Sequence, residues 1–117
     1  MAPTHGSIAS KLRGAAPLFA ALGDDTRLAL VARLCSQGPQ SIARLSDGAK
    51  VTRQAITKHL RTLESAGLVS SAREGREQIW QIRPKRVAEA RHYLDSISAD
   101  WDQAIERLRA FVETTEP

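Results

Sequence analysis

The sequence has few cysteines, few aromatic residues and no long apolar run. Cys35 is the single cysteine of the 117 residues, so no disulfide can form within the chain. Aromatic residues make up 4% of the total, and the core must therefore be built from Leu, Ile, Val and Ala. No run is apolar enough for a membrane span, and Asp24 and Asp25 interrupt the N-terminal stretch before a signal peptide is complete. We therefore expect one cytoplasmic domain with no membrane partner.

Enzyme motifs are also missing from the sequence. It contains no glycine-rich phosphate loop and no nucleophile elbow. Zinc and soft metals take three or four nitrogen or sulfur ligands, whereas this chain offers one cysteine and three scattered histidines. These absences argue against an enzyme, a metal site or a bound cofactor.

The sequence does contain a concentration of positive charge. The net charge is +4, but the segment from Lys50 to Arg91 has ten Lys or Arg residues against four Glu, a net charge of +6. The rest of the chain carries seven basic and nine acidic residues, a net charge of −2. This asymmetry favours a polyanionic partner at one surface. Nucleic acid fits better than a membrane, because no basic segment also presents a bulky aromatic and apolar face.

The stretch VTRQAITKHLRTLESAGLV, from Val51 to Val69, predicts an amphipathic helix from Thr52 to about Ala66. Thr52 is a suitable N-cap, and Gly67 suits the position after the helix, where a positive φ is favoured. One arc of this helix carries Ala55, Ile56, His59, Leu60, Leu63 and Ala66. The other arc carries Arg53, Gln54, Thr57, Lys58, Arg61 and Glu64.

The polar arc has side chains of the kinds that read DNA. The residues whose donors and acceptors can reach base edges in a major groove are Arg53, Gln54, Thr57 and Lys58. Arg61, one turn further along, suits a phosphate. The alternative interpretation is an ordinary solvated helix face.

Shorter helical patterns precede this helix. A first helix is expected from about Ala16 to Leu22, and Asp24 offers the N-cap of a second. The second helix is expected to carry on its apolar face Leu28, Val31, Ala32, Leu34 and Cys35. Gly38-Pro39 ends it, and a third helix is expected from about Ser41 to Asp47. The tight turn from Gly48 to Val51 then completes a helix-turn-helix.

Two β-prone stretches follow, from Val69 to Arg73 and from Gln78 to Ile82, with a turn around Gly75. A hairpin that follows a recognition helix is a wing, and Arg73 and Arg76 place positive charge at its tip. An ordinary surface hairpin is the alternative. The expected fold class is mainly α with a small β-hairpin, a winged helix-turn-helix.

The last helix begins at Pro84 and is expected over about 85–112. Its apolar residues recur at spacings of four and three, at Ala90, Leu94, Ile97, Trp101, Ala104, Leu108 and Phe111. At 1.5 Å per residue the helix gives an apolar stripe about 40 Å long, which a small domain cannot easily cover. We expect it to pack against a second copy of the chain, helped by Phe19 of the first helix, with packing inside one chain as the alternative.

The expected domain spans residues 16–112, between a flexible arm at 1–15 and a tail at 113–117. Three segments within it together resemble one family: LGDDTRLALVARL, VTRQAITKHLRTLESAGLV and REGREQIWQI. They are similar to the ArsR-type (ArsR/SmtB) family of winged helix-turn-helix transcriptional repressors, over roughly Pro17 to Phe111. The most specific part, T-K-H-L-x-x-L-x-x-A-G-L-V, resembles the family's S-x-H-L-x-x-L-x-x-A-G-L-V. The resemblance implies a homodimer that binds double-stranded DNA at an inverted-repeat operator and represses transcription.

The resemblance also implies roles for individual residues. In the family's mode of binding, the four base-reading candidates would enter the groove, while Thr52 and Arg61 hold phosphates and Arg73 and Arg76 act from the wing. His59 matches a histidine of the family and is expected to make hydrogen-bonded packing contacts. The family's binding of a small-molecule inducer stays open for this chain, with the cleft between the first and last helices as its expected place.

The chain departs from the metal-sensing members of the family. They carry a C-x-C pair in the third helix, where this chain has Ser41 and Ala43. A second metal pattern, of Asp and His residues along the last helix, is not reproduced around His92. These departures predict that the protein does not sense metal. Two other functions stay open: a winged helix that binds proteins or RNA, and a redox response of Cys35, although a buried core cysteine is the commoner case.

Overall fold

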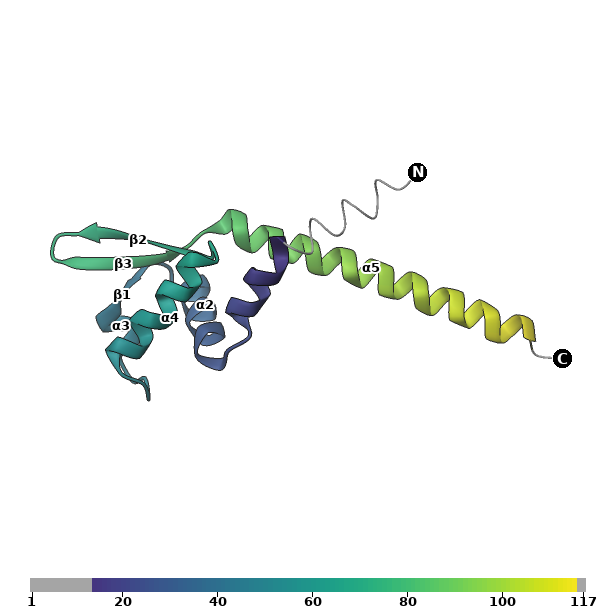
Figure 1. The fold of residues 1–117 in the computed structure, drawn as a ribbon, viewed down its shortest axis with the longest axis horizontal. Coiled ribbons are helices and arrows are strands. Elements are labelled where there is room, and N and C mark those ends of the chain that lie inside the picture. The colour runs from purple at the N-terminus through teal and green to yellow at the C-terminus, as the bar shows by residue number, and fades with distance from the viewer. Residues whose placement is uncertain (1–13, 116–117) are drawn as a thin grey trace.

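Short helices and a small antiparallel sheet form the body of the molecule, and one long helix projects from it (Figure 1). The computed structural model describes residues 14–115. In chain order the elements are a helical segment at 14–22, α2 (Asp25–Gln37), β1 (Gln40–Ser41), α3 (Ile42–Ser46), α4 (Arg53–Ser65), β2 (Val69–Glu74), β3 (Glu77–Ile82) and α5 (Pro84–Thr115). The predicted winged helix-turn-helix architecture, mainly α with a small sheet, is confirmed.

Side-chain caps set the helix starts that the sequence predicted. The Asp24 carboxylate accepts a hydrogen bond from the backbone N–H of Arg27 at 3.0 Å and caps α2. The Thr52 hydroxyl accepts one from the N–H of Ala55 at 3.1 Å and caps α4. Gly67 follows α4 with a φ of 81°, a conformation that costs a residue with a side chain more than it costs glycine.

The hairpin matches its prediction but is longer by one residue on each strand. Glu74 pairs with Glu77 across a two-residue turn in which Gly75 has a φ of 62°. β1 was not predicted from the sequence. Its Gln40 pairs with Trp80, so that the sheet order is β1-β3-β2. A two-residue strand has no periodicity to detect, and only the approach of a distant strand reveals it.

The core lies where α2, α3 and α4 pack against the sheet, with Leu18 and Ala21 of the N-terminal helical segment added. The fully or almost fully buried side chains include Leu18, Leu45, Ile56, Leu60, Leu63, Leu68, Val69 and Trp80. As predicted, the core contains few aromatic side chains and many aliphatic ones. The apolar arc proposed for the amphipathic helix is therefore the buried arc of α4.

The face assigned to the second helix was right at Val31 and Leu34 and wrong at Leu28, Ala32 and Cys35. Leu30, Val31 and Leu34 are the buried residues of α2, whereas Ala32 and Cys35 are exposed and Leu28 is 53% exposed. Leu28, Ala32 and Cys35 recur at helical spacing just as Leu30, Val31 and Leu34 do, so the pattern alone cannot tell which side is buried. Packing of α2 against α4 and β3 selects the face that contains Leu30.

The ends of the expected domain also differ from the structure. Residues 14 and 15, assigned to a flexible arm, are helical, and α5 continues through 113–115, assigned to a tail. The remainder of the expected arm and tail, 1–13 and 116–117, lies outside the described residues. Among residues 14–115, no helix combines the length and apolar character that crossing a membrane requires.

The orientation of α2 predicts unequal effects of two similar substitutions. Leu30 is 5% exposed, so Leu30→Ala should leave a cavity and lower the free energy of unfolding by about 2–5 kcal/mol. Leu28→Ala, on the solvent side, should change it by less than about 0.5 kcal/mol. Urea unfolding followed by circular dichroism measures both. Equal losses would show that the face is misassigned.

Candidate nucleic-acid interface

The start and outward face of α4 present the polar residues predicted to contact DNA. Thr52, Arg53, Gln54 and Lys58 are exposed, and Thr57 is half-buried. The Thr57 hydroxyl donates a hydrogen bond to the carbonyl oxygen of Arg53 at 2.9 Å, so its hydrogen is already engaged. Thr57 therefore offers an acceptor lone pair and a methyl group, which suit a base amino group or a thymine methyl.

Arg61 lies where α4 meets the hairpin. Its guanidinium donates to the Glu64 carboxylate at 2.9 Å and lies 5.1 Å from the centroid of the buried Trp80 ring. The side chain is still 53% exposed, and a guanidinium has five N–H donors. Arg61 is thus held in place by its own chain and keeps donors for a phosphate.

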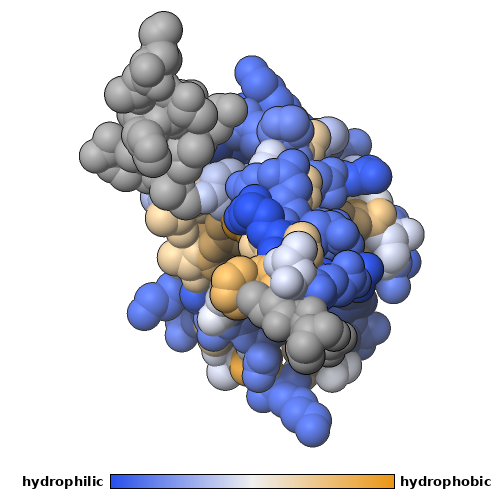
Figure 2. Space-filling view, turned by 90° about the vertical axis from the view of Figure 1, so that its right-hand side faces the viewer, coloured by the Kyte–Doolittle hydropathy of each residue, from blue (hydrophilic) through white to orange (hydrophobic). Residues whose placement is uncertain are grey.

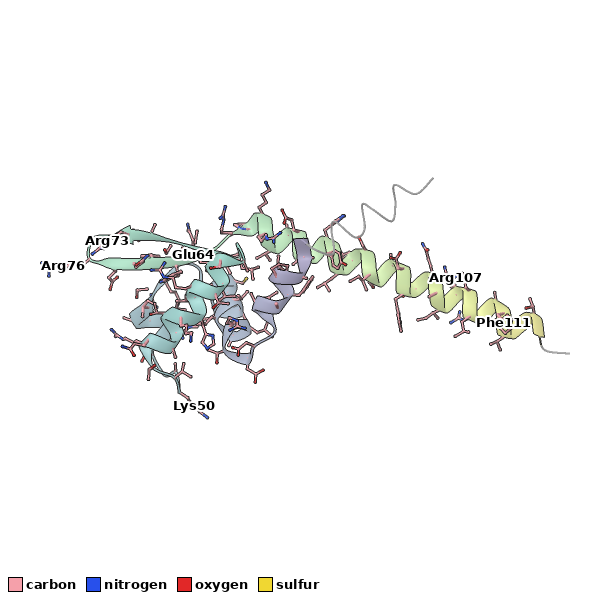
Figure 3. The ribbon with its side chains drawn as sticks, in the orientation of Figure 1. Lys50, Glu64, Arg73, Arg76, Arg107 and Phe111 are labelled. Atoms are coloured by element: carbon pink, nitrogen blue, oxygen red, sulfur yellow. The ribbon has the colours of Figure 1, made fainter. Side chains whose placement is uncertain are left out.

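A polar network joins α4 to both strands of the wing. The Ser71 hydroxyl of β2 donates to Glu64 at 3.4 Å, and the Gln78 amide of β3 donates to Ser71 at 2.8 Å. Figure 3 shows Glu64 at this junction. The network and the Arg61–Trp80 contact together constrain the angle between wing and helix. Glu64 was predicted only to lie on the polar arc of the helix. Its positioning role was not predicted, because Ser71 and Gln78 come from elsewhere in the chain.

The tip of the hairpin carries Arg73 and Arg76, as predicted. Both side chains are exposed, and Figure 3 places them at the end of the molecule opposite to Arg107 and Phe111 of α5. Lys50, in the turn before α4, is exposed as well. The positive side chains of α4, the turn and the wing therefore lie on the body and away from the projecting half of α5.

His59 links α4 to α2, and Arg27 of α2 in turn links to the N-terminal helical segment. The Nδ1 of His59 lies 3.2 Å from a guanidinium nitrogen of Arg27 and 3.9 Å from the Asp24 carboxylate. Because a guanidinium can only donate, Nδ1 is the acceptor, and Arg27 also donates to the carbonyl of Ala21. Hydrogen bonding by the Arg27 backbone N–H is the main cause that lowers the pKa of the Asp24 carboxyl. The predicted hydrogen-bonded packing role of His59 is confirmed.

The residues predicted for dimerisation fall into two groups. Phe19 is half-buried and packs within its own chain against Tyr93, with ring centroids 5.8 Å apart. The six candidates on α5 are all exposed: Leu94, Ile97, Trp101, Ala104, Leu108 and Phe111. Figure 2, viewed from the end toward which α5 projects, shows apolar residues gathered in one area beside polar ones.

A groove of about 550 Å³ lies between the N-terminal helical segment and the start of α5. Its lining includes Gly14, Leu18, Ala88, Ala90 and Tyr93, at the place expected for an inducer. The Arg86 side chain crosses here, with hydrogen bonds to the carbonyl oxygens of Gly14 at 3.0 Å and Ala66 at 3.2 Å.

The remaining candidates concern metal and redox chemistry. Within residues 14–115, no group of three or more His, Cys, Asp or Glu side chains is arranged to hold a metal ion. Ser41, which stands at one position of the family's C-x-C pair, caps α3 by accepting from the N–H of Arg44 at 3.3 Å. Cys35 is exposed rather than buried, so its expected place in the core was wrong.

Comparisons with known proteins agree with this geometry. A family model described as a helix-turn-helix domain matches residues 22–72. The chain is 32% identical over 87 residues to a helix-turn-helix transcriptional regulator of Methanocaldococcus jannaschii, covering 74% of this chain and 98% of that protein. It is 35% identical over 85 residues to one of Mycobacterium tuberculosis, covering 73% of this chain and 76% of that protein.

A solved structure extends the match to almost the whole chain. The ArsR-like transcriptional regulator from Rhodococcus sp. RHA1 is 34% identical, with a TM-score of 0.71, over 94% of this chain and 97% of that one. Fold, sequence and the exposed basic helix thus point the same way, toward binding of DNA and away from catalysis. The chain belongs to the ArsR family of winged helix-turn-helix transcriptional regulators.

Proposed function

We propose that the protein is a homodimeric repressor that binds an inverted-repeat DNA operator and does not sense metal. The observation that carries the proposal is the exposed, basic and amide-rich face of α4, with a second positive site at the wing tip. Burial of Ile56, Leu60 and Leu63 directs this face outward. A helix of this kind fits a major groove.

The exposed residues divide by the kind of contact they can make. On α4, the residues proposed to read bases are Arg53, Gln54, Thr57 and Lys58. Thr52, Arg61 and the wing arginines are proposed to bind phosphates, which position the protein and carry no sequence information. Arg61 supports this division, because its pairing with Glu64 and Trp80 holds it one turn beyond the base-reading residues.

A dimer is supported by the exposed apolar stripe of α5. Leu94, Trp101 and Leu108 are each more than half exposed in the single chain. Two subunits related by a twofold axis would present two α4 helices to successive major grooves, about 34 Å apart. Independence from metal is supported by Ser41 and Ala43 at the positions of the family's thiolate pair, since neither offers a soft ligand.

Loss of base reading tests the operator proposal. Gln54→Ala combined with Thr57→Ala should abolish discrimination between the operator and unrelated DNA, because each good base contact contributes about 1–3 kcal/mol of specificity. Gel shifts with the DNA upstream of the gene, at two salt concentrations, measure this loss, and circular dichroism should stay unchanged. A wild-type protein that shows no sequence preference there would instead favour a protein- or RNA-binding module.

A substitution in the wing should weaken DNA binding without changing sequence preference. Arg76→Ala removes a positive side chain that is proposed to neutralise a phosphate, so affinity should fall about equally for operator and unrelated DNA. The slope of log K against log salt should become shallower by about one unit per subunit. Arg109→Ala, on the projecting half of α5, is the matched control and should leave both quantities unchanged. A selective loss at the operator alone would contradict the phosphate assignment.

The α5 stripe can be tested directly for self-association. Trp101, 66% exposed in the single chain, should be buried in the dimer, so Trp101→Glu should give monomers and lose operator binding. Light scattering measures the mass, and Gln103→Glu, on the outward side of α5, should stay dimeric. A Trp101→Glu protein that remains a dimer would contradict this use of the stripe.

A further inference from the structure

The groove between the N-terminal helical segment (14–22) and the start of α5 lies outside the proposed DNA-binding face. Its volume is about 550 Å³, and its walls are mostly apolar, with Ala15, Leu18, Ala88 and Tyr93 among the lining residues. The charged and imidazole side chains that line it all come from α5: Lys85, Arg86, Glu89 and His92. A mostly apolar concavity of this size with a few polar groups is typical of a small-molecule site.

We infer that this groove binds a small organic anion, with a hydrocarbon body against the apolar walls and a carboxylate at Lys85 and Arg86. Ten Lys and Arg residues lie between Lys50 and Arg91. Four of them stand at the start of α5 and outside the proposed DNA contacts: Arg83, Lys85, Arg86 and Arg91. Lys85 is exposed and forms no ion pair within residues 14–115. A carboxylate beside it would gain a charge-assisted hydrogen bond.

Arg86 connects the groove to the end of α4. Its Nε donates to the carbonyl oxygen of Ala66, the C-cap of α4, at 3.2 Å, and its Nη2 donates to that of Gly14 at 3.0 Å. Its Nη1 donates to the Glu89 carboxylate at 2.6 Å. A guanidinium has five N–H groups, and these three bonds within the described part of the chain leave two for a ligand.

A ligand in the groove should therefore act on α4. A cation at the C-terminus of a helix stabilises its last turn. A carboxylate that draws the Arg86 guanidinium toward the groove weakens its bond to Ala66 and loosens this end of α4. The bound anion should lower the affinity for the operator, and operator DNA should lower the affinity for the anion by the same factor. This effect on DNA rests on the operator binding proposed above, whereas the binding of the anion does not.

The groove is separate from the apolar stripe of α5. At 3.6 residues per turn, His92 lies on the opposite side of the helix from Trp101, and Lys85 and Ala88 lie within about 40° of His92. A partner that covers the stripe would therefore not reach this side of the groove. The anion and a second subunit can be bound at the same time.

Octanoate tests the ligand class with the full chain, because it joins one carboxylate to a short hydrocarbon chain. Isothermal titration calorimetry should show that octanoate binds on the order of tenfold more tightly than octanol, which lacks the charge. Acetate, which lacks the chain, should bind more weakly than both. Tyr93 is the single tyrosine of the sequence, so the NMR signals of its labelled ring report on the groove and should shift with octanoate. Equal binding of octanol would overturn the anion, and unshifted Tyr93 signals would overturn the groove.

Substitutions on α5 locate the site. Ala88→Trp should fill the groove and weaken octanoate binding on the order of tenfold. The matched control is Ala99→Trp, about three turns further along the same exposed side of α5, which should leave binding unchanged. Glu89→Gln should strengthen binding, because it removes a negative charge beside the carboxylate. Equal affinities of the two Trp variants, with circular dichroism showing both folded, would overturn the site.

Arg86→Lys separates binding from its effect on DNA. Lysine keeps the positive charge but lacks the planar fork that joins Gly14, Ala66 and Glu89, so octanoate should still bind while operator affinity no longer responds to it. In gel shifts, saturating octanoate should weaken operator binding by the wild type on the order of tenfold. Octanoate that shifts the Tyr93 signals without changing operator affinity would overturn the regulation. A wild type that binds octanoate but has no operator preference would overturn the proposed function and leave the site intact.

Discussion

Burial of one side of α4 is the interaction on which the rest of the structure depends. Ile56, Leu60 and Leu63 are at most 1% exposed, and each contributes on the order of 1.5–3 kcal/mol by leaving water. Rotating the helix to hide its polar side would expose all three and bury charged groups without partners. The residues proposed to face DNA are therefore directed outward by the core behind them, and the caps at Thr52 and Gly67 set where that face begins and ends.

The wing is also held by the core, but its packing against the core decreases from the base of the hairpin to the tip. Val69 and Trp80 are buried at the base of the hairpin, where Trp80 also supports the Arg61 guanidinium. The side chains from Ala72 to Gln78 are exposed, so no packing holds the tip. The Glu64–Ser71–Gln78 network lies between these two regions. A firmly oriented base with an exposed, positively charged tip suits contacts to a flexible phosphate backbone.

The long helix α5 depends on the core only over its first turns. Its first turns, around Ala90 and Tyr93, pack on the N-terminal helical segment, and the remainder leaves the body (Figure 1). The molecule thus separates a body that carries the proposed DNA-binding face from a projecting helix with an exposed apolar stripe. In the proposed dimer, the same helix that joins the subunits also determines the distance between their two α4 helices. Any change of register in α5 would then alter the spacing of the DNA contacts.

The sequence by itself determined the elements that depend on neighbours in the chain. The N-caps at Asp24 and Thr52, the amphipathic α4, the hairpin around Gly75 and the seam of α5 all rest on spacings of a few residues. Periodicity indicates which side of a segment is apolar, and α4 has a single apolar side. The placement of the candidate DNA-binding residues on an exposed face could be predicted for the same reason.

Only the tertiary structure decided the contacts between distant segments. It selected the Leu30 side of α2 over the Leu28 side, exposed Cys35, added β1 to the sheet and brought Glu64 to Ser71 and Gln78. In each case the local pattern allowed two arrangements of similar energy or gave no pattern at all. The choice came from which surfaces met when the chain closed on itself, because burial and hydrogen bonding between remote residues contribute energy only after the fold has brought them together.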